Sequence, residues 1–145
     1  MGGQSVIRAE AKWVERLQFV GRGLGSGGAL LVAGSSGEDG QVCGIRPMEA
    51  LLASLASCSG MDVISILQKM KQRVTGFRVE AEGQRADEHP RRYEQITLTY
   101  VVRGHEIQEA KVARAIELSL EKYCGVTGSL NAEIRSDYRI ASDDR

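Results

Sequence analysis

The sequence predicts an α+β domain with the element order ββ, α, ββ, α, β. Two observations predict it. Apolar residues alternate with polar residues in several segments, as in half-buried strands, and they recur every three or four residues in two others, as in helices. The length of 145 residues, with no internal repeat and no linker, predicts a single domain over residues 1–145.

The first third of the chain predicts a β hairpin. Apolar residues alternate from Val6 to Val20, which predicts one half-buried strand, and Ala29–Ala33 predicts a second, short strand. The segment GRGLGSGG between them lacks the GxxxxGK[ST] spacing of a phosphate-binding loop and precedes a strand instead of a helix. We therefore interpret it as a turn.

The centre of the chain predicts a long helix from Pro47 to about Gln72. Proline is tolerated at the first helical position because its missing N–H is not needed there. Apolar residues cover several faces of this helix, so it must be buried on most sides. The run Ala50–Leu67 also contains Asp62 and four serines, which would be costly in lipid. These polar residues favour a buried helix over a membrane span.

The second half predicts another hairpin, a second helix and a last strand. Apolar alternation predicts the hairpin from Val74–Ala81 and Tyr93–Val102, and the last strand near Ala132–Ile140. Helical spacing between residues 107 and 123 predicts the second helix, with Cys124 at or just beyond its C-terminal end.

Composition excludes several function classes. Nineteen basic and nineteen acidic residues balance, so nucleic acid and anionic membrane surfaces are not expected partners. The N-terminal residues do not resemble a secretory signal, which predicts a cytoplasmic protein. The three cysteines form no CxxC pair and neither histidine has zinc-ligand spacing, so no metal and no disulfide framework are expected. Cys43 is interpreted as incidental.

Two motifs in order, RPMEALLASLASCSGMDVISILQKM and VARAIELSLEKYCGV, resemble the OsmC/Ohr family of osmotically inducible and organic hydroperoxide resistance proteins. The likeness runs from about Lys12 to Ile140. It is nearest to the OsmC-like branch with PME before the first helix and an aspartate four residues after the first motif's cysteine. The resemblance implies an intertwined homodimer with curved antiparallel sheets and two central helices.

The resemblance also implies a chemistry. Family members reduce hydroperoxides, organic ones preferentially, with thiols and without a metal or other cofactor. By position, Cys58 matches the cysteine that attacks the peroxide, and Cys124 matches the resolving cysteine. A dithiol, either a lipoyl-type group or another small thiol, is implied as reductant. The chemistry itself requires two thiols, because the sulfenic acid formed by the first must condense with the second.

The residues that activate the attacking thiol depart from the family's pattern. In the better-known branches, an arginine of the first hairpin is held by a glutamate directly after the helix-start proline. Here Met48 follows Pro47, and the carboxylate is Glu49, nine residues before Cys58. At about 100° per residue, Glu49 would point half a turn away from the thiol. Arg22 and Arg46 are both candidates for the positive charge that a thiolate needs.

Asp62 lies four residues after Cys58 and therefore on the same helix face. Alone, its charge would raise the pKa of the thiol, so we expect it to pair with an arginine or to join a polar network. The departures near the helix start leave an alternative function open. The protein would then be a non-enzymatic module that binds a small molecule in the dimer-interface cavity or senses redox state.

Overall fold

A computed structural model describes residues 5–34 and 44–143; Cys43 lies outside them. The chain divides into two compact units, Met1–Leu51 and Leu52–Arg145. That residues 1–145 act as one domain stays a prediction. The predicted α+β fold class is confirmed, since both units contain a sheet and α1 begins in the first and continues through the second.

The first unit contains a three-stranded antiparallel sheet in the order β1-β2-β3, formed by Ala9–Glu15, Gln18–Gly23 and Ala29–Ala33. The prediction of one strand over residues 6–20 is therefore wrong. The chain reverses at Arg16, whose φ of 46° is left-handed, and the Arg16 carbonyl accepts a 2.8 Å hydrogen bond from Trp13 Nε1. No glycine or proline marks this turn, and the apolar alternation, interrupted only at Glu15, resumes beyond it at Leu17 and Phe19.

Helix α1, Pro47–Lys69, starts at the predicted proline and ends a few residues earlier than predicted. At its start, Glu49 Oε1 accepts a 3.1 Å hydrogen bond from the backbone N–H of Arg46. At its end, Lys71 takes a left-handed φ of 62°, which helical continuation does not allow. Among the described residues, only α1 is long and apolar enough to cross a membrane, with 28% of its most apolar window buried.

The second unit contains a sheet in the order β4-β5-β6, with bounds Arg73–Arg85, Tyr93–His105 and Glu133–Ser142. Strands β4 and β5 form the predicted hairpin. Strand β6 pairs with β5 in parallel, so the expectation of antiparallel sheets is wrong for this pair. The connection between the two strands explains the parallel pairing. After β5 the chain returns through the helices to the end of the sheet where β5 began, so β6 runs in the same direction as β5.

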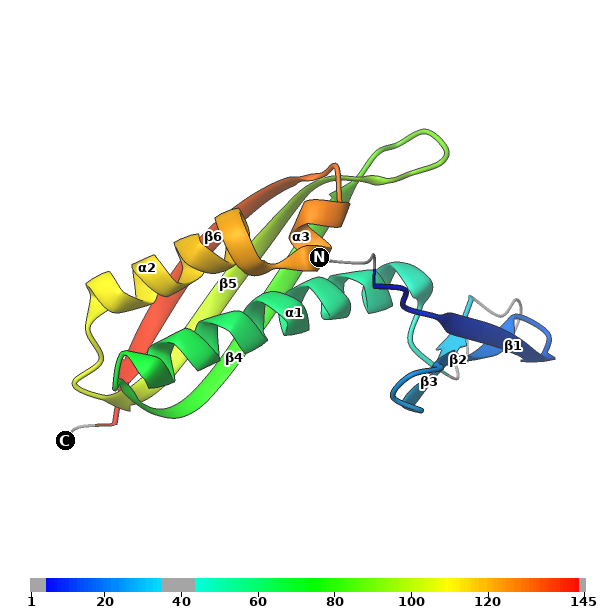
Figure 1. Cartoon of the computed structure of the whole chain (residues 1–145). Coiled ribbons are helices and arrows are strands. Elements are labelled where there is room, and N and C mark those ends of the chain that lie inside the picture. The colour runs from blue at the N-terminus through cyan, green and yellow to red at the C-terminus, as the bar shows by residue number, and fades with distance from the viewer. Residues whose placement is uncertain (1–4, 35–43, 144–145) are drawn as a thin grey trace. The chain divides into compact units, whose positions relative to one another are not determined.

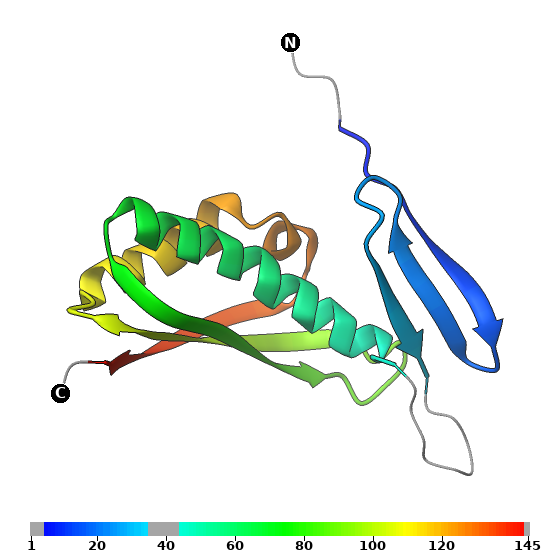
Figure 2. The same ribbon diagram turned by 90° about the horizontal axis from the view of Figure 1, so that it is seen from below.

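Two helices cover the same face of this sheet (Figures 1 and 2). One is α1 from residue 52 onward, and the other is α2, Glu109–Leu118. The buried core between helices and sheet is formed by Leu55, Val63 and Leu67 of α1, alternate residues of β5 (Ile96, Leu98, Tyr100 and Val102), and Val112, Ala115 and Ile116 of α2. Buried residues recur at every second position along β5 and at helical spacing along α1 and α2, as the apolar residues of the sequence do.

The segment after α2 differs from the predicted single helix. A π-helical turn, η2, covers Ser119–Tyr123, and the backbone N–H of Cys124 donates to the carbonyl of Ser119 at 2.7 Å. Such turns insert one extra residue into a helix. Cys124 then precedes a short helix, α3, Gly125–Ser129, where the sequence predicts only a loosened chain. Cys124 itself lies just beyond the helical segment, as predicted.

Candidate active site

Cys58 and Cys124, separated widely in sequence, lie together in the second unit. Cys58 projects from the middle of α1 and is half-buried, whereas Cys124 is 6% exposed. Both are free thiols, and the Cys124 side chain is among the causes that raise the pKa of Cys58, so the two thiols are neighbours. The packing of α1 beside the end of the second helical segment thus places one accessible thiol against a buried one.

Opposing influences act on the Cys58 thiol. Hydrogen bonds from the backbone N–H groups of Val126 and, more weakly, Gly125 favour the thiolate. Burial, the hydrogen bond with Cys124 and the charge of Cys124 act against it, and together they raise the pKa of Cys58. No cationic side chain of the described residues is among the causes. The backbone N–H donors therefore favour the Cys58 thiolate, but the net effect of the surroundings in this structure is a raised and not a lowered pKa.

Asp62 belongs to a buried polar network beside the two cysteines. Its Oδ2 accepts a 2.9 Å hydrogen bond from Ser119 Oγ. Ser119 Oγ lies 2.8 Å from Ser59 Oγ, which lies 2.6 Å from the Tyr100 hydroxyl. Ser59, Ser119 and Tyr100 are fully buried. Asp62 was expected either to pair with an arginine or to join a polar network, and the structure has the network. No ion pair of Asp62 is found within residues 5–34 and 44–143.

The pKa of Tyr100 is raised because the network lies in a buried region. Burial raises the pKa of Tyr100 to about 12, the hydrogen bond with Ser59 acts in the opposite direction, and the charges of Cys124 and Asp62 add to the rise. The phenol therefore keeps its proton at neutral pH and remains a hydrogen-bond donor.

The remaining predicted site residues, Arg22, Arg46 and Glu49, belong to the first unit. Arg22 on β2 makes a 3.5 Å ion pair with Glu10, its cross-strand neighbour, and both side chains are about half exposed. Glu49 bonds the backbone of Arg46 at the start of α1. These contacts account for Arg22 and Glu49 locally, and a role of any of the three in the thiol chemistry stays a prediction.

Three network residues were not predicted as site residues: Ser59, Ser119 and Tyr100. The sequence contains a signal for the two serines, because each occupies a position in the apolar periodicity of its helix. A serine at a core position needs a buried hydrogen-bond partner, and here the two serines bond each other. Tyr100 follows the alternation of β5 and differs from its apolar neighbours only by its hydroxyl.

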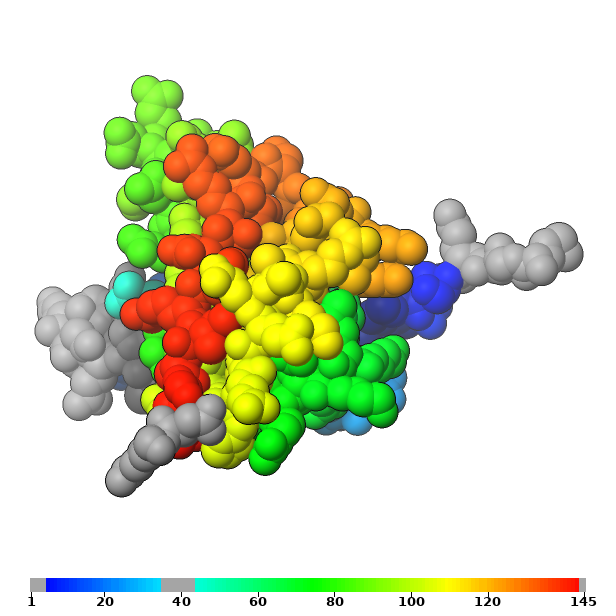
Figure 3. Space-filling model, turned by 90° about the vertical axis from the view of Figure 1, so that its left-hand side faces the viewer, coloured from blue at the N-terminus to red at the C-terminus, as the bar shows by residue number. Residues whose placement is uncertain are grey.

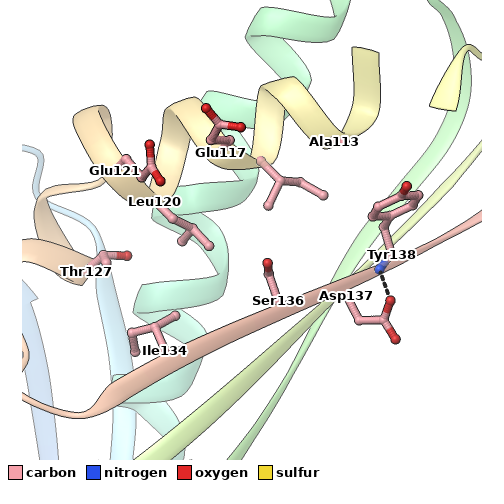
Figure 4. Close-up of a pocket in the computed structure, with 10 residues that line it drawn as sticks. Ala113, Glu117, Leu120, Glu121, Thr127, Ile134, Ser136, Asp137 and Tyr138 are labelled. Atoms are coloured by element: carbon pink, nitrogen blue, oxygen red, sulfur yellow. Dashed lines mark hydrogen bonds between the residues drawn. The ribbon is translucent and has the colours of Figure 1, made fainter. Parts of the chain in front are cut away.

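A pocket of about 490 Å³ lies between the second helical segment and β6, two elements that lie side by side in the space-filling view (Figure 3). Leu120 and Ile134 line it from opposite walls (Figure 4). Neither cysteine lines it. Thr127 is its link to the thiols, since its backbone N–H donates to Cys124 Sγ at 3.4 Å while its buried Oγ1 has no hydrogen-bond partner among the described residues.

No group of three or more histidine, cysteine, aspartate or glutamate side chains able to hold a metal occurs in the described part of the chain.

Comparisons with known proteins extend over most of the chain. Residues 37–139 match the family described as OsmC-like protein. Protein YhfA of Escherichia coli strain K12 is 42% identical over 120 residues, which cover 83% of this chain and 86% of that protein. A hypothetical protein from Aquifex aeolicus is structurally similar, with a TM-score of 0.84 at 29% identity over 97% of this chain and 100% of that chain.

A further solved structure shares the fold at low identity. It is an organic hydroperoxide resistance protein from Elizabethkingia anophelis, with a TM-score of 0.68 at 13% identity over 99% of this chain and 100% of that chain.

Proposed function

This chain belongs to the OsmC-like protein family, and from that premise we propose that it is a thiol-dependent peroxidase that reduces organic hydroperoxides. The observation that carries the proposal is the contact between the half-buried Cys58 thiol and the buried Cys124 thiol. Structural relatives that bear the name organic hydroperoxide resistance protein support the choice of substrate.

The proposed reaction has two covalent steps. The Cys58 thiolate attacks the terminal oxygen of the hydroperoxide, so that an S–O bond forms and the O–O bond breaks. The alkoxide leaves as the alcohol with the proton that the Cys58 thiol gave up on ionising. Cys124 then attacks the sulfenic sulfur of Cys58, an S–S bond forms, and the hydroxide leaves as water with the proton of the second thiol. Two thiols lose two electrons in total, and the hydroperoxide gains them.

The proposal includes the assembly and the reductant. A dithiol, either a lipoyl-type group or a small thiol, reduces the Cys58–Cys124 disulfide and closes the cycle. The protein acts as a cytoplasmic homodimer without metal, cofactor, nucleic acid or membrane partner. Asp62 supports the site through its network, and Arg22 or Arg46 supplies the positive charge that the Cys58 thiolate needs.

One observation favours a second function. The pKa of Cys58 is raised, whereas an efficient peroxidatic thiol needs a lowered one. A thiol pair without activation suits a module that senses redox state or binds a small molecule without turnover. Such a module would show saturable binding, or slow oxidation without catalytic peroxide consumption.

The first experiment is a reaction of the reduced protein with one equivalent of cumene hydroperoxide, followed by peptide mass spectrometry. We expect a Cys58–Cys124 disulfide to form in the wild type and expect no peroxide consumption above background in Cys58→Ala. In Cys124→Ala we expect a sulfenic acid on Cys58, trapped by dimedone.

Two comparisons make the result decisive. Hydrogen peroxide, reacted in parallel, measures the preference for organic substrates. Full peroxide turnover by Cys58→Ala would contradict the proposal. Oxidation of the wild type no faster than that of an ordinary exposed thiol would favour the sensing or binding module.

A further inference from the structure

The polar network beside the thiols connects the two cysteine-bearing segments by side-chain hydrogen bonds. Ser59 directly follows Cys58 on α1, and Ser119 is the residue whose carbonyl accepts the backbone N–H of Cys124 at 2.7 Å. The hydroxyls of Ser59 and Ser119 bond each other at 2.8 Å, and both residues are fully buried. The backbone of each cysteine is thus joined, through one peptide bond or one short hydrogen bond, to one serine of this pair.

Asp62 determines which hydroxyl donates and which accepts in each hydrogen bond of the network. A serine or tyrosine hydroxyl has one hydrogen to donate, whereas a carboxylate only accepts. Ser119 therefore donates its hydrogen to Asp62 at 2.9 Å and can only accept from Ser59. Ser59, having donated to Ser119, can only accept from Tyr100 at 2.6 Å. All three hydroxyl hydrogens point toward Asp62.

Without Asp62, the direction is no longer fixed. Ser119 could then donate to the Ser59 carbonyl at 3.5 Å, which is long for a hydrogen bond between oxygens, or to Ser59 Oγ at 2.8 Å with the direction of that bond reversed. Loss of Asp62 would thus remove one of the two links of the Ser119 hydroxyl and leave the other free to take either direction.

From this geometry we propose that Ser59 and Ser119 are positioning residues that hold the Cys58 turn of α1 against Cys124, with Asp62 fixing the direction of their hydrogen bonds. The inference rests on the proposed function for its biological meaning, since the step it serves is disulfide formation. In that step Cys124 attacks Cys58, and small displacements of reacting atoms cause large losses of rate. The first step, attack on the peroxide by Cys58 alone, does not need the second sulfur in place.

The test measures disulfide formation without a peroxide. Diamide, a diazene, oxidises two thiols to a disulfide and is itself reduced to the hydrazine. We expect Ser119→Ala, which breaks both hydroxyl links, to slow Cys58–Cys124 disulfide formation by about tenfold or more. Alkylation of Cys58 by iodoacetamide, a reaction of one sulfur, should not slow, because it does not need Cys124 in place.

Ser57→Ala is the matched control. Ser57 flanks Cys58 on the other side, is exposed, and donates its hydroxyl only to the Ala53 carbonyl of its own helix, at 2.6 Å. Both rates should therefore stay at the wild-type value. Tyr100→Phe removes only the far end of the network and should slow the disulfide step less than Ser119→Ala.

The pair Asp62→Asn and Asp62→Ala provides an independent test at a half-buried position, in case Ser119→Ala does not fold by circular dichroism. Asparagine keeps an acceptor oxygen for Ser119 and should retain most of the disulfide rate, whereas alanine should retain less, since it removes one link of Ser119 and the fixed direction of the other. Wild-type disulfide rates in folded Ser119→Ala, or in Asp62→Ala, would overturn the inference.

The same experiments separate this inference from the proposed function. If diamide forms the disulfide more slowly in Ser119→Ala and Asp62→Ala, as expected, but cumene hydroperoxide does not react with the wild type, the peroxidase proposal fails and the positioning role stands. If peroxide oxidises the wild type rapidly and the Ser119→Ala disulfide forms as fast, the positioning role fails and the peroxidase proposal stands.

Discussion

At the scale of single residues, the neighbouring Cys124 affects both the reactivity of Cys58 and the disulfide that Cys58 can form. The proximity of the two thiols supports disulfide formation, yet the hydrogen bond and the charge of Cys124 both contribute to the raised pKa of Cys58. A raised pKa means a smaller thiolate fraction at neutral pH and hence slower nucleophilic reactions. The resolving thiol thus aids the second step of the proposed reaction and hinders the first.

Removal of that neighbour should make Cys58 more reactive. In Cys124→Ala, two causes of the rise disappear while the N–H donors of Val126 and Gly125 remain, so the pKa of Cys58 should fall. We expect the iodoacetamide rate of Cys58 at neutral pH to increase by about two- to tenfold, since one pKa unit changes the thiolate fraction about tenfold. The pH profile of alkylation, with product sites assigned by mass spectrometry, should move to lower pH.

An unchanged profile, or one displaced to higher pH, would mean that burial and not Cys124 governs the thiol. Cys58→Ala, measured in parallel, reports how much alkylation occurs at other sites.

At the scale of elements, the start of α1 explains why a carboxylate occurs at residue 49. Glu49 reaches back to the backbone N–H of Arg46 at 3.1 Å, which is one half of a capping box without the usual serine or threonine. The bond satisfies one of the donors that every helix start leaves unpaired. Glu49 is therefore accounted for by helix formation alone, and any part in the thiol chemistry would be additional.

Glu49→Ala should lower the free energy of unfolding by about 1 kcal/mol, since the exposed Arg46 N–H then bonds to water in place of the side chain. Urea unfolding measures the change. Glu49→Gln keeps an acceptor oxygen and should cost less. Equal stability of Glu49→Ala and the wild type, together with a slower peroxide reaction, would reassign Glu49 from the helix start to the thiol site.

At the scale of the whole molecule, apolar surface without a partner supports the proposed homodimer. On the first sheet, Trp13, Phe19 and Val32 are cross-strand neighbours and thus share one face, where Trp13 is 63% exposed. On α1, only 28% of the most apolar window is buried, and an apolar groove beside it is lined by Met61 and Phe77, among others. Surfaces of this kind mark interaction sites in proteins.

Trp13→Glu should convert the proposed dimer into a monomer, because a buried unpaired carboxylate at an interface is costly. Size-exclusion chromatography with light scattering measures the mass. Lys12→Glu changes the charge on the opposite face of the same strand and should leave the dimer intact. A monomeric wild type, or equal masses for the two variants, would contradict the assignment of this face to the interface.

Much of the fold follows from periodicity. Pro47, the three- and four-residue spacing after it and the alternation along β5 predict α1 and the β4–β5 hairpin, because these patterns report local geometry directly. The turn at Arg16 was missed because a left-handed arginine has no residue-type signal. The parallel pairing of β6 was missed because strand direction depends on the crossover and not on the pattern within the strand.

The sequence by itself determined the family, the α+β order and the two cysteines with an aspartate one turn after the first, since these are features of residue identity and spacing. Only the tertiary structure decided that Cys58 contacts Cys124 and that Ser59, Ser119 and Tyr100 join Asp62. The reason is physical: a hydrogen bond between side chains some sixty residues apart depends on helix packing, which no local pattern encodes.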